Sequence, residues 1–171
     1  TSNAGASNAG IGTFFASLPG FGRGDAYVKG AHLALFEATD LRGGLVDNPD
    51  AKTYADIKDM YYVGVGSNYG NNMTAKWARY DGYVNVIRLA EMFLSRAEAN
   101  FMNSSTVGDT PENDINVIRA RAKATLLVGA PTLNDIKAER VKELCFEGHA
   151  LSDLKRWQAS TTAPGTSPWA G

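Results

Sequence analysis

The sequence predicts a mainly α fold, in which a helical hairpin and a third, kinked helix follow a loop-rich N-terminal half that carries at most short strands. Two observations support this. Residues 1–83 hold 13 of the 18 glycines and 12 of the 17 aromatic residues, including all seven tyrosines, which is typical of irregular chain. Residues 84–157 carry apolar residues at helical spacing between helix-capping signals. We expect both segments to share one domain and residues 158–171 to form an irregular tail.

The composition excludes several classes of protein. Of the 171 residues, 44% are hydrophobic and 20% are charged, which is ordinary for a globular domain and unlike disordered or collagenous chains. The net charge of -1 supplies no basic field to attract nucleic acid or anionic lipid. The single cysteine, Cys145, rules out an intrachain disulfide. No apolar run approaches the roughly 18 residues that a membrane span needs.

The loop-rich half contains only short candidate elements. Residues 32–38 fit either a short helix or a strand, and residues 54–60 fit one or two helical turns. Residues 61–65 and 75–80 alternate enough between apolar and polar side chains to form short strands.

The predicted hairpin consists of two helices. The first runs from about Val84 to Met102, and its apolar residues recur every three or four positions. The second begins at Thr110, a good N-cap, with Pro111 at the first helical position, where a missing N–H costs nothing. The predicted core faces of the two helices are Ile87, Ala90, Leu94, Ala97 and Phe101, and then Ile115, Ile118 and Ala122.

The third helix begins at residues 132–135, where Thr-Leu-Asn-Asp has the pattern of a capping box. Gly148 lies within its apolar pattern, and glycine costs roughly 1 kcal/mol relative to alanine inside a helix. We therefore expect a kink or a short break there, followed by a last turn over residues 151–157. The residues predicted to face the core are Ile136, Val141, Leu144 and Cys145.

One row of side chains resembles catalytic machinery. Cys145, His149 and Asp153 are four residues apart, so an unbroken helix would place a thiol, an imidazole and a carboxylate on one face. The same cysteine and histidine could instead be two metal ligands. We favour a structural interpretation, because Gly148 interrupts the row and Cys145 belongs to the apolar stripe, where free cysteines are inert.

Three further patterns also favour structural interpretations. Glu139, Glu143 and Glu147 are expected to pair with neighbouring basic side chains rather than act as a glycosidase acid/base pair. The glycine-rich segments 20–25 and 64–70 lack the Lys-Ser/Thr pair of a phosphate-binding loop. The acidic turn Asp47-Asn48-Pro49-Asp50 lacks a calcium-loop pattern. We predict no catalytic residue, no metal site and no cofactor.

The second half contains three sequence blocks: VIRLAEMFLSRAEA at 86–99, NVIRARA at 116–122, and ERVKELCFEGH followed by DLKRW between 139 and 157. In this order they resemble the SusD/RagB family of outer-membrane glycan-binding lipoproteins. Asp40-Leu41-Arg42 also resembles an upstream Asp-x-Arg of that family. The chain departs from the family at Ala150 and Leu151, where an Arg and an aromatic residue are usual. The family's lipidated N-terminal cysteine and closing segment are missing, so we expect a C-terminal fragment of a longer protein.

The resemblance implies a tetratricopeptide-like helical hairpin used as a scaffold, with Glu147, His149 and Trp157 holding the last helix. It implies a non-catalytic protein that binds oligosaccharide or polysaccharide at the cell surface. Its partner would be a SusC-like TonB-dependent outer-membrane transporter, and its parent would be held in the outer membrane by a lipid anchor absent from this chain. The alternative is a helical protein-interaction scaffold that does not bind sugar.

The resemblance places ligand contacts on loops upstream of the first helical block, and the composition indicates the same region. Aromatic side chains there stand among Gly, Asn and Ser, and a flat aromatic face stacks on a sugar ring while polar neighbours bond its hydroxyls. We expect about two thirds of these aromatic residues to be core and the rest exposed. On residue chemistry we choose as ligand-binding candidates Phe21, Arg23, Tyr27, Tyr62, Tyr69 and Trp77.

Overall fold

The computed structural model describes residues 11–18, 20, 22–46, 60–78 and 84–157. The chain divides into two compact units, Thr1–Val84 and Asn85–Gly171, which are considered separately below. Within the described ranges, no helix is both long and apolar enough to cross a membrane.

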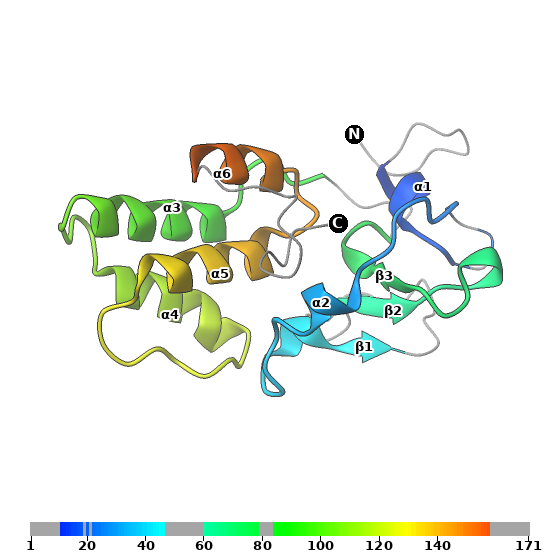
Figure 1. The fold of residues 1–171 in the computed structure, drawn as a ribbon, viewed down its shortest axis with the longest axis horizontal. Coiled ribbons are helices and arrows are strands. Elements are labelled where there is room, and N and C mark those ends of the chain that lie inside the picture. Colours follow the sequence, from blue (N-terminus) through cyan, green and yellow to red (C-terminus); the bar gives the residue numbers. More distant parts are fainter. Residues whose placement is uncertain (1–10, 19, 21, 47–59, 79–83, 158–171) are drawn as a thin grey trace. The chain divides into compact units, whose positions relative to one another are not determined.

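The first unit consists of short elements joined by loops (Figure 1). Three strands form a small sheet in the order β1-β2-β3, with β1 parallel to β2 and β2 antiparallel to β3. The strands are β1 Leu45–Val46, β2 Tyr61–Val63 and β3 Asn72–Thr74; the helices are α1 Ile11–Phe15 and α2 Gly30–Leu33; and the 3₁₀ turns cover Leu41–Gly43, Gly66–Asn68 and Ala75–Trp77.

The sheet and α1 enclose a small core. Tyr62 pairs with Met73 across β2 and β3, and both side chains are completely buried. They form a cluster with residues that follow α1 and β3, namely Ala16, Leu18, Ala75 and Ala78. Side chains from three separate short segments therefore form this core. For that reason no long periodic pattern in the sequence predicts it.

The structure agrees with some of the elements predicted for the first unit and differs from others. The strand predicted at 61–65 is confirmed by β2. At 32–38, α2 favours the helical alternative, although this one-turn helix ends at Leu33. The strand predicted at 75–80 is wrong, because Ala75–Trp77 forms a 3₁₀ turn. The Thr74 side chain accepts a hydrogen bond from the backbone N–H of Lys76, which favours a turn over an extended strand. Most of the helical turn predicted at 54–60 lies outside the described residues.

Over residues 85–157, the part of the second unit that the structure describes, the chain forms four helices: α3 Leu89–Met102, α4 Pro111–Arg121, α5 Leu133–Leu144 and α6 Ala150–Arg156. Figure 1 shows α3 and α4 as a hairpin with α5 packed against it. The capping signals were correct: the Thr110 side chain accepts from the N–H of Asn113, and Thr132 and Asp135 form a complete capping box. The mainly α, tetratricopeptide-like hairpin with a third helix is thus confirmed.

The core of this unit lies where α3, α4 and α5 meet. Its two clusters contain one residue from each helix, namely Leu94, Ile118 and Leu144, and then Ala97, Ile115 and Ile136. All six belong to the predicted core faces of the three helices, and each is at most 3% exposed. Helical periodicity therefore located the core.

The first helix begins at Leu89, later than the predicted Val84. Arg88 is its N-cap residue and has extended backbone angles, φ -127° and ψ 149°. Ile87, which was assigned to the core stripe, lies before the helix and is 70% exposed. The periodic pattern continued into residues that do not belong to the helix.

The break that Gly148 suggested is present but starts earlier. α5 ends at Leu144 and α6 begins at Ala150. Between them, Phe146 and Gly148 both have positive φ, 61° and 85°, and a positive φ is incompatible with a right-handed helix. Cys145, which was predicted to face the core from within the helix, is its half-buried C-cap residue.

Candidate functional site

A loop of the first unit lies along α1 and exposes an arginine beside an aromatic ring. The backbone N–H of Arg23 donates to Thr13 O at 2.7 Å, and that of Asp25 donates to Phe14 O at 2.7 Å. These bonds fix the loop to the helix. They place the guanidinium carbon of Arg23 5.1 Å from the centroid of the Phe14 ring, within the range of a cation–π contact. Phe14 is 40% exposed.

Arg23 also forms an ion pair with Asp25 in the same loop. Arg23 Nε lies 3.1 Å from Asp25 Oδ2, and the Nη2 nitrogen contacts the same oxygen. This hydrogen bond and the attraction of the carboxylate raise the pKa of Arg23. The two side chains are 47% and 42% exposed, so they hold each other in a defined orientation while donors and acceptors remain open to solvent. Sugar hydroxyls both donate and accept hydrogen bonds, and such a pair offers both functions.

A second segment joins this loop at its backbone. Asn68 ends the 3₁₀ turn before Tyr69, and its Nδ2 donates to Arg23 O at 3.0 Å. The approach is close: a Cβ at Gly24, which has a φ of +64°, would lie 2.5 Å from Asn68 Nδ2. Only glycine therefore fits there. The next residue, Tyr69, is 84% exposed.

We name the resulting surface the aromatic patch and define it as Phe14, Arg23, Asp25, Asn68 and Tyr69. It combines the exposed Phe14 ring with the Arg23–Asp25 ion pair, and the Asn68 amide joins to this loop the segment that continues into the exposed Tyr69. This is the arrangement of chemical groups that sugar recognition uses: flat apolar faces with a few positioned polar groups.

The six sequence-chosen candidates are placed differently. Arg23 and Tyr69 belong to the aromatic patch, and Tyr27, close to it in sequence, is 57% exposed. Tyr62 and Trp77 are buried at 0% and 6% exposure, so neither offers a ring face to a ligand in this structure. Phe21 lies outside the described residues.

Tyr62 is instead a support for the patch. Its hydroxyl oxygen accepts a hydrogen bond from the backbone N–H of Ser17 at 2.8 Å, just after α1, and burial raises its pKa. Residue type alone could not separate Tyr62 from Tyr69, because burial depends on pairing with Met73 across the sheet. Asp25 and Asn68 were missed for a similar reason: only the folded loop brings them to Arg23.

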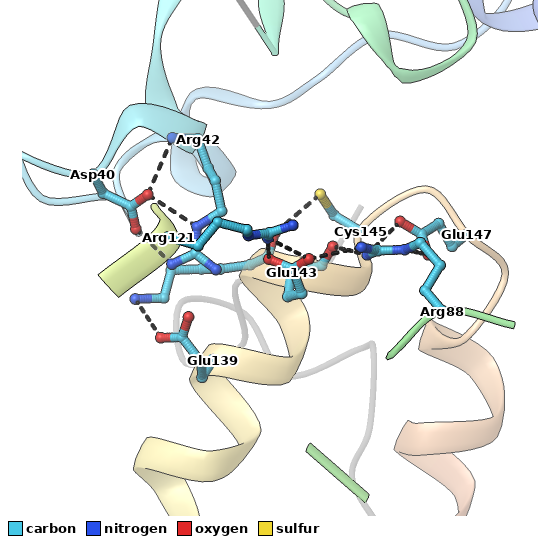
Figure 2. A network of polar contacts seen from close by, with 9 residues as sticks. Asp40, Arg42, Arg88, Arg121, Glu139, Glu143, Cys145 and Glu147 are labelled. Carbon is cyan, nitrogen blue, oxygen red and sulfur yellow. Dashed lines mark hydrogen bonds and ion pairs between the residues drawn. The ribbon is translucent and has the colours of Figure 1, made fainter. Parts of the chain in front are cut away.

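The helical unit carries a different group of polar residues, an ion-pair network around Glu143 (Figure 2). Arg88 bonds Glu143 Oε1 and both carboxylate oxygens of Glu147, each at 2.8 Å, while Arg121 bonds Glu143 at 2.6 Å. Burial, the largest influence on Glu143, would raise its pKa, but Arg121 and Arg88 together hold that pKa below its usual value. Glu143 is therefore a charged structural residue.

The predicted ion-paired face of α5 is thus present, with partners that were only partly foreseen. Lys142 does pair with Glu139, at 3.3 Å. The other cations come from earlier in the chain: Arg119 lies 2.9 Å from Glu139, and Arg88 reaches Glu143 and Glu147 from the start of α3. Arg88 and Arg119 belong to the first and second sequence blocks described above, and the glutamates that they bond belong to the third. The three blocks therefore contain both members of these ion pairs.

The row of Cys145, His149 and Asp153 does not assemble into a catalytic site. The Cys145 thiol donates to the carbonyl of Lys142 at 3.3 Å. Asp153 accepts from Arg140 at 2.8 Å, and the nearest ionic group to His149 is Glu91 at 3.7 Å. Each member therefore contacts a residue outside the row. In the described part of the chain, no three His, Cys, Asp or Glu side chains are grouped so that they could hold a metal ion.

Comparison with known proteins agrees with the resemblance seen in the sequence. The model of the SusD family matches residues 43–167. The starch-binding protein SusD of Bacteroides thetaiotaomicron is 29% identical over 160 residues, which cover 79% of this chain. Only 28% of that relative is matched, so the chain spans little more than a quarter of its length.

One solved structure shows the same fold, and a second is similar over a smaller part of the chain. A SusD superfamily protein from Parabacteroides distasonis aligns with 90% of this chain and 35% of its own, at a TM-score of 0.57 and 16% identity. A SusD-like protein from Bacteroides fragilis aligns with 61% of this chain and 21% of its own, at a TM-score of 0.42 and 22% identity.

Proposed function

From the premise that this chain belongs to the SusD family, we propose that it binds an oligosaccharide at the cell surface without catalysing a reaction. The aromatic patch is the proposed binding surface. In the full-length protein, the bound glycan would pass to a SusC-like TonB-dependent transporter in the outer membrane, where a lipid anchor would hold the binding protein.

The observation that carries this proposal is the exposed Phe14 ring beside the fixed Arg23–Asp25 pair, with a second exposed ring, Tyr69, next in sequence to the Asn68 that bonds Arg23. Tyr69 is among the most exposed large side chains of the described chain, at 84%, although burying a tyrosine normally stabilises a fold. Phe14 is held next to Arg23 rather than in the core. Aromatic faces kept in water beside oriented hydrogen-bonding groups are suited to a ligand that is apolar on its ring faces and polar at its edges, which describes a pyranose ring.

Starch is the first glycan to test, because the relative with 29% identity is a starch-binding protein. The match covers only part of that relative, so a panel of other plant and host polysaccharides belongs in the same experiment.

A helical interaction scaffold is the second candidate, and exposed apolar residues on the other unit favour it. Val86 and Leu89, at the start of α3, are 84% and 70% exposed, and Met102 at its end is 65% exposed. Such side chains commonly mark a protein-binding surface when they are grouped. A pull-down that recovers a transporter from a chain with no glycan affinity would favour this function.

The test is isothermal titration calorimetry of the chain against the panel, followed by Tyr69→Ala. We expect saturable heat with at least one glycan. Loss of the stacking face should weaken binding roughly tenfold, since aromatic contacts contribute about 1–1.5 kcal/mol. The unfolding midpoint should not change, because Tyr69 packs against little.

Phe101→Ala is the matched control, since it removes an exposed ring (37% exposed) from the helical unit. We expect it to leave glycan affinity unchanged. If no glycan of the panel binds, the proposed function is wrong. If a glycan binds but Tyr69→Ala binds it as well as the wild type, the function survives and the aromatic patch is not its site.

A further inference from the structure

The helical unit contains an open cavity of about 390 Å³ that the proposed function does not use. Three helices line it: α3 contributes four residues, α5 contributes Arg140 and α6 contributes Arg156. The lining residues from α3 are Ser95, Glu98, Ala99 and Met102. A cavity of this volume is large enough to hold a ligand of the size of one sugar ring.

Arg140 is the buried charge in this cavity. Its side chain is only 7% exposed. Nε donates to Asp153 at 2.8 Å, and Nη1 donates to the Ser95 hydroxyl at the long distance of 3.2 Å. Within the described part of the chain, Nη2 of Arg140 donates no hydrogen bond. One edge of the guanidinium is thus committed to Asp153, while the other edge has spare donors, which is the geometry that binds a carboxylate in bidentate fashion.

The second arginine of the cavity is already paired. Both terminal nitrogens of Arg156 bond the carboxylate of Glu98, which also accepts from Trp157 Nε1 at 2.8 Å. Burial, the largest influence on Glu98, would raise its pKa, but Arg156 and Trp157 outweigh it and keep the carboxyl ionised. Asp153 bonds both arginines, Arg140 at 2.8 Å and Arg156 at 3.0 Å, so Glu98 and Asp153 together balance the two positive charges. What distinguishes Arg140 is therefore its unused donors rather than a net charge.

The remaining walls are apolar or neutral. Ala99 and Met102 face the cavity from the last turn of α3. Met102 is 65% exposed, so it stands where the cavity opens to solvent, while Arg140 lies deeper. A ligand that fits would carry a carboxylate toward Arg140 and an apolar face toward the methionine.

We propose that this cavity binds the carboxylate of a sugar acid, with Arg140 as the anion-binding residue and Met102 as the wall against the ring. The choice of a sugar acid rests on the proposed glycan-binding function. The site differs from the aromatic patch because it selects for negative charge, which neutral glucans lack.

The experiment titrates the chain with sodium glucuronate, and with glucose and sodium acetate as comparisons, by calorimetry. We expect glucuronate to bind at least tenfold more tightly than either, since each comparison lacks one of the two recognised features. In ¹⁵N-labelled protein, the Nε–Hε resonance of Arg140 should shift on binding.

Met102→Trp should fill the mouth of the cavity and weaken glucuronate binding at least tenfold, without removing any ion pair. Met92→Trp makes the same change at another half-exposed position of α3 and should alter affinity less than twofold. No saturable binding of glucuronate, equal binding of acetate, or undiminished binding by Met102→Trp would overturn the proposal.

Tyr69→Ala separates this proposal from the proposed function. It should leave glucuronate affinity unchanged; if it abolishes glucuronate binding, the ligand occupies the aromatic patch and the cavity is not the site. If glucuronate binding depends on Met102 while no glycan of the panel binds, the proposed function fails and the cavity site stands.

Discussion

Among single residues, Arg88 shows how charge is used in the helical unit. Arg88 has extended backbone angles and is the N-cap residue of α3, although its side chain makes no capping bond to that helix. The side chain instead donates four hydrogen bonds to residues at and just after the end of α5. One of these goes to the carbonyl of Glu143 and the others to Glu143 and Glu147 carboxylates. A single side chain thus joins the beginning of one helix to the end of another.

Arg88→Ala should therefore destabilise the helical unit strongly. It removes the bonds from Arg88 to Glu147, whose side chain is 8% exposed, and breaking a buried ion pair costs roughly 3–5 kcal/mol. Urea denaturation followed by circular dichroism measures the effect. Lys155→Ala, a change at an exposed position, should stay within about 0.5 kcal/mol of the wild type. Equal midpoints for the two variants would contradict the structural role of Arg88.

His32 predicts a pH dependence of stability in the first unit. Its Nε2 lies 2.8 Å from the Tyr61 hydroxyl, and burial, with a smaller contribution from Lys76, lowers its pKa to about 4. In the unfolded chain, histidine titrates near 6.5. Above pH 6.5 the imidazole is neutral in both states, and stability is at its full value. As the pH falls from 6.5 to 4, only the unfolded state gains the proton, and the free energy of unfolding decreases by about 3 kcal/mol.

The measurement is the urea midpoint as a function of pH for the wild type and His32→Gln. The wild type should lose stability between pH 6.5 and 4.5, a window above the pKa values of ordinary carboxyls, and the variant should show a much flatter profile there. Parallel profiles would show that His32 does not stay neutral in the folded state.

Residue chemistry in the sequence predicted part of the candidate site. Arg23 and Tyr69, which were chosen as ligand-binding candidates, are exposed, while Tyr62 and Trp77 are buried and Phe14 was not chosen. The difference arises from long-range pairing: Tyr62 is buried by Met73, and Phe14 is exposed beside Arg23 because a loop folds back on α1. Neither fact can be read from local spacing.

At the scale of elements, local signals predicted best where the chain makes its own contacts. The N-caps Thr110 and Thr132 bond residues three positions later, so their signature is contained in four consecutive letters. The C-terminal end of α5 was misplaced, because Phe146, a non-glycine residue, has a positive φ. The start of α3 was misplaced, because the contacts of Arg88 with Glu143 and Glu147 determine it. Of the two- and three-residue strands that the structure describes, alternation located β2 but not β1 or β3.

The break between α5 and α6 depends on backbone angles at Gly148. Its φ is +85°, and a Cβ there would contact nothing within 4 Å. Gly148→Ala should therefore cost only the conformational penalty of about 1–2 kcal/mol, measured as a shift of the urea midpoint. Gly30 also has open space around it but no positive φ, so Gly30→Ala should be neutral or stabilising by about 0.4–1 kcal/mol. The same sign of change in both variants would contradict this explanation.

For the whole molecule, the two units correspond to two kinds of evidence. The family match covers residues 43–167, which include all four helices of the second unit and, from the aromatic patch, only Asn68 and Tyr69. The match therefore extends over parts of both units, while Phe14, Arg23 and Asp25 lie outside it and rest on geometry alone. The division of the chain into a binding half before residue 84 and a scaffold half after it remains our proposal.

The most direct test of that proposal is to map where a glycan binds on the ¹⁵N-labelled chain, using the tightest ligand from the calorimetric panel. We predict that the largest chemical-shift changes fall on residues 13–28 and 66–72, with Arg23, Asn68 and Tyr69 among them, while α3 to α6 change little. Largest changes within α3 to α6, with residues 66–72 unaffected, would contradict the account and assign binding to the helical unit.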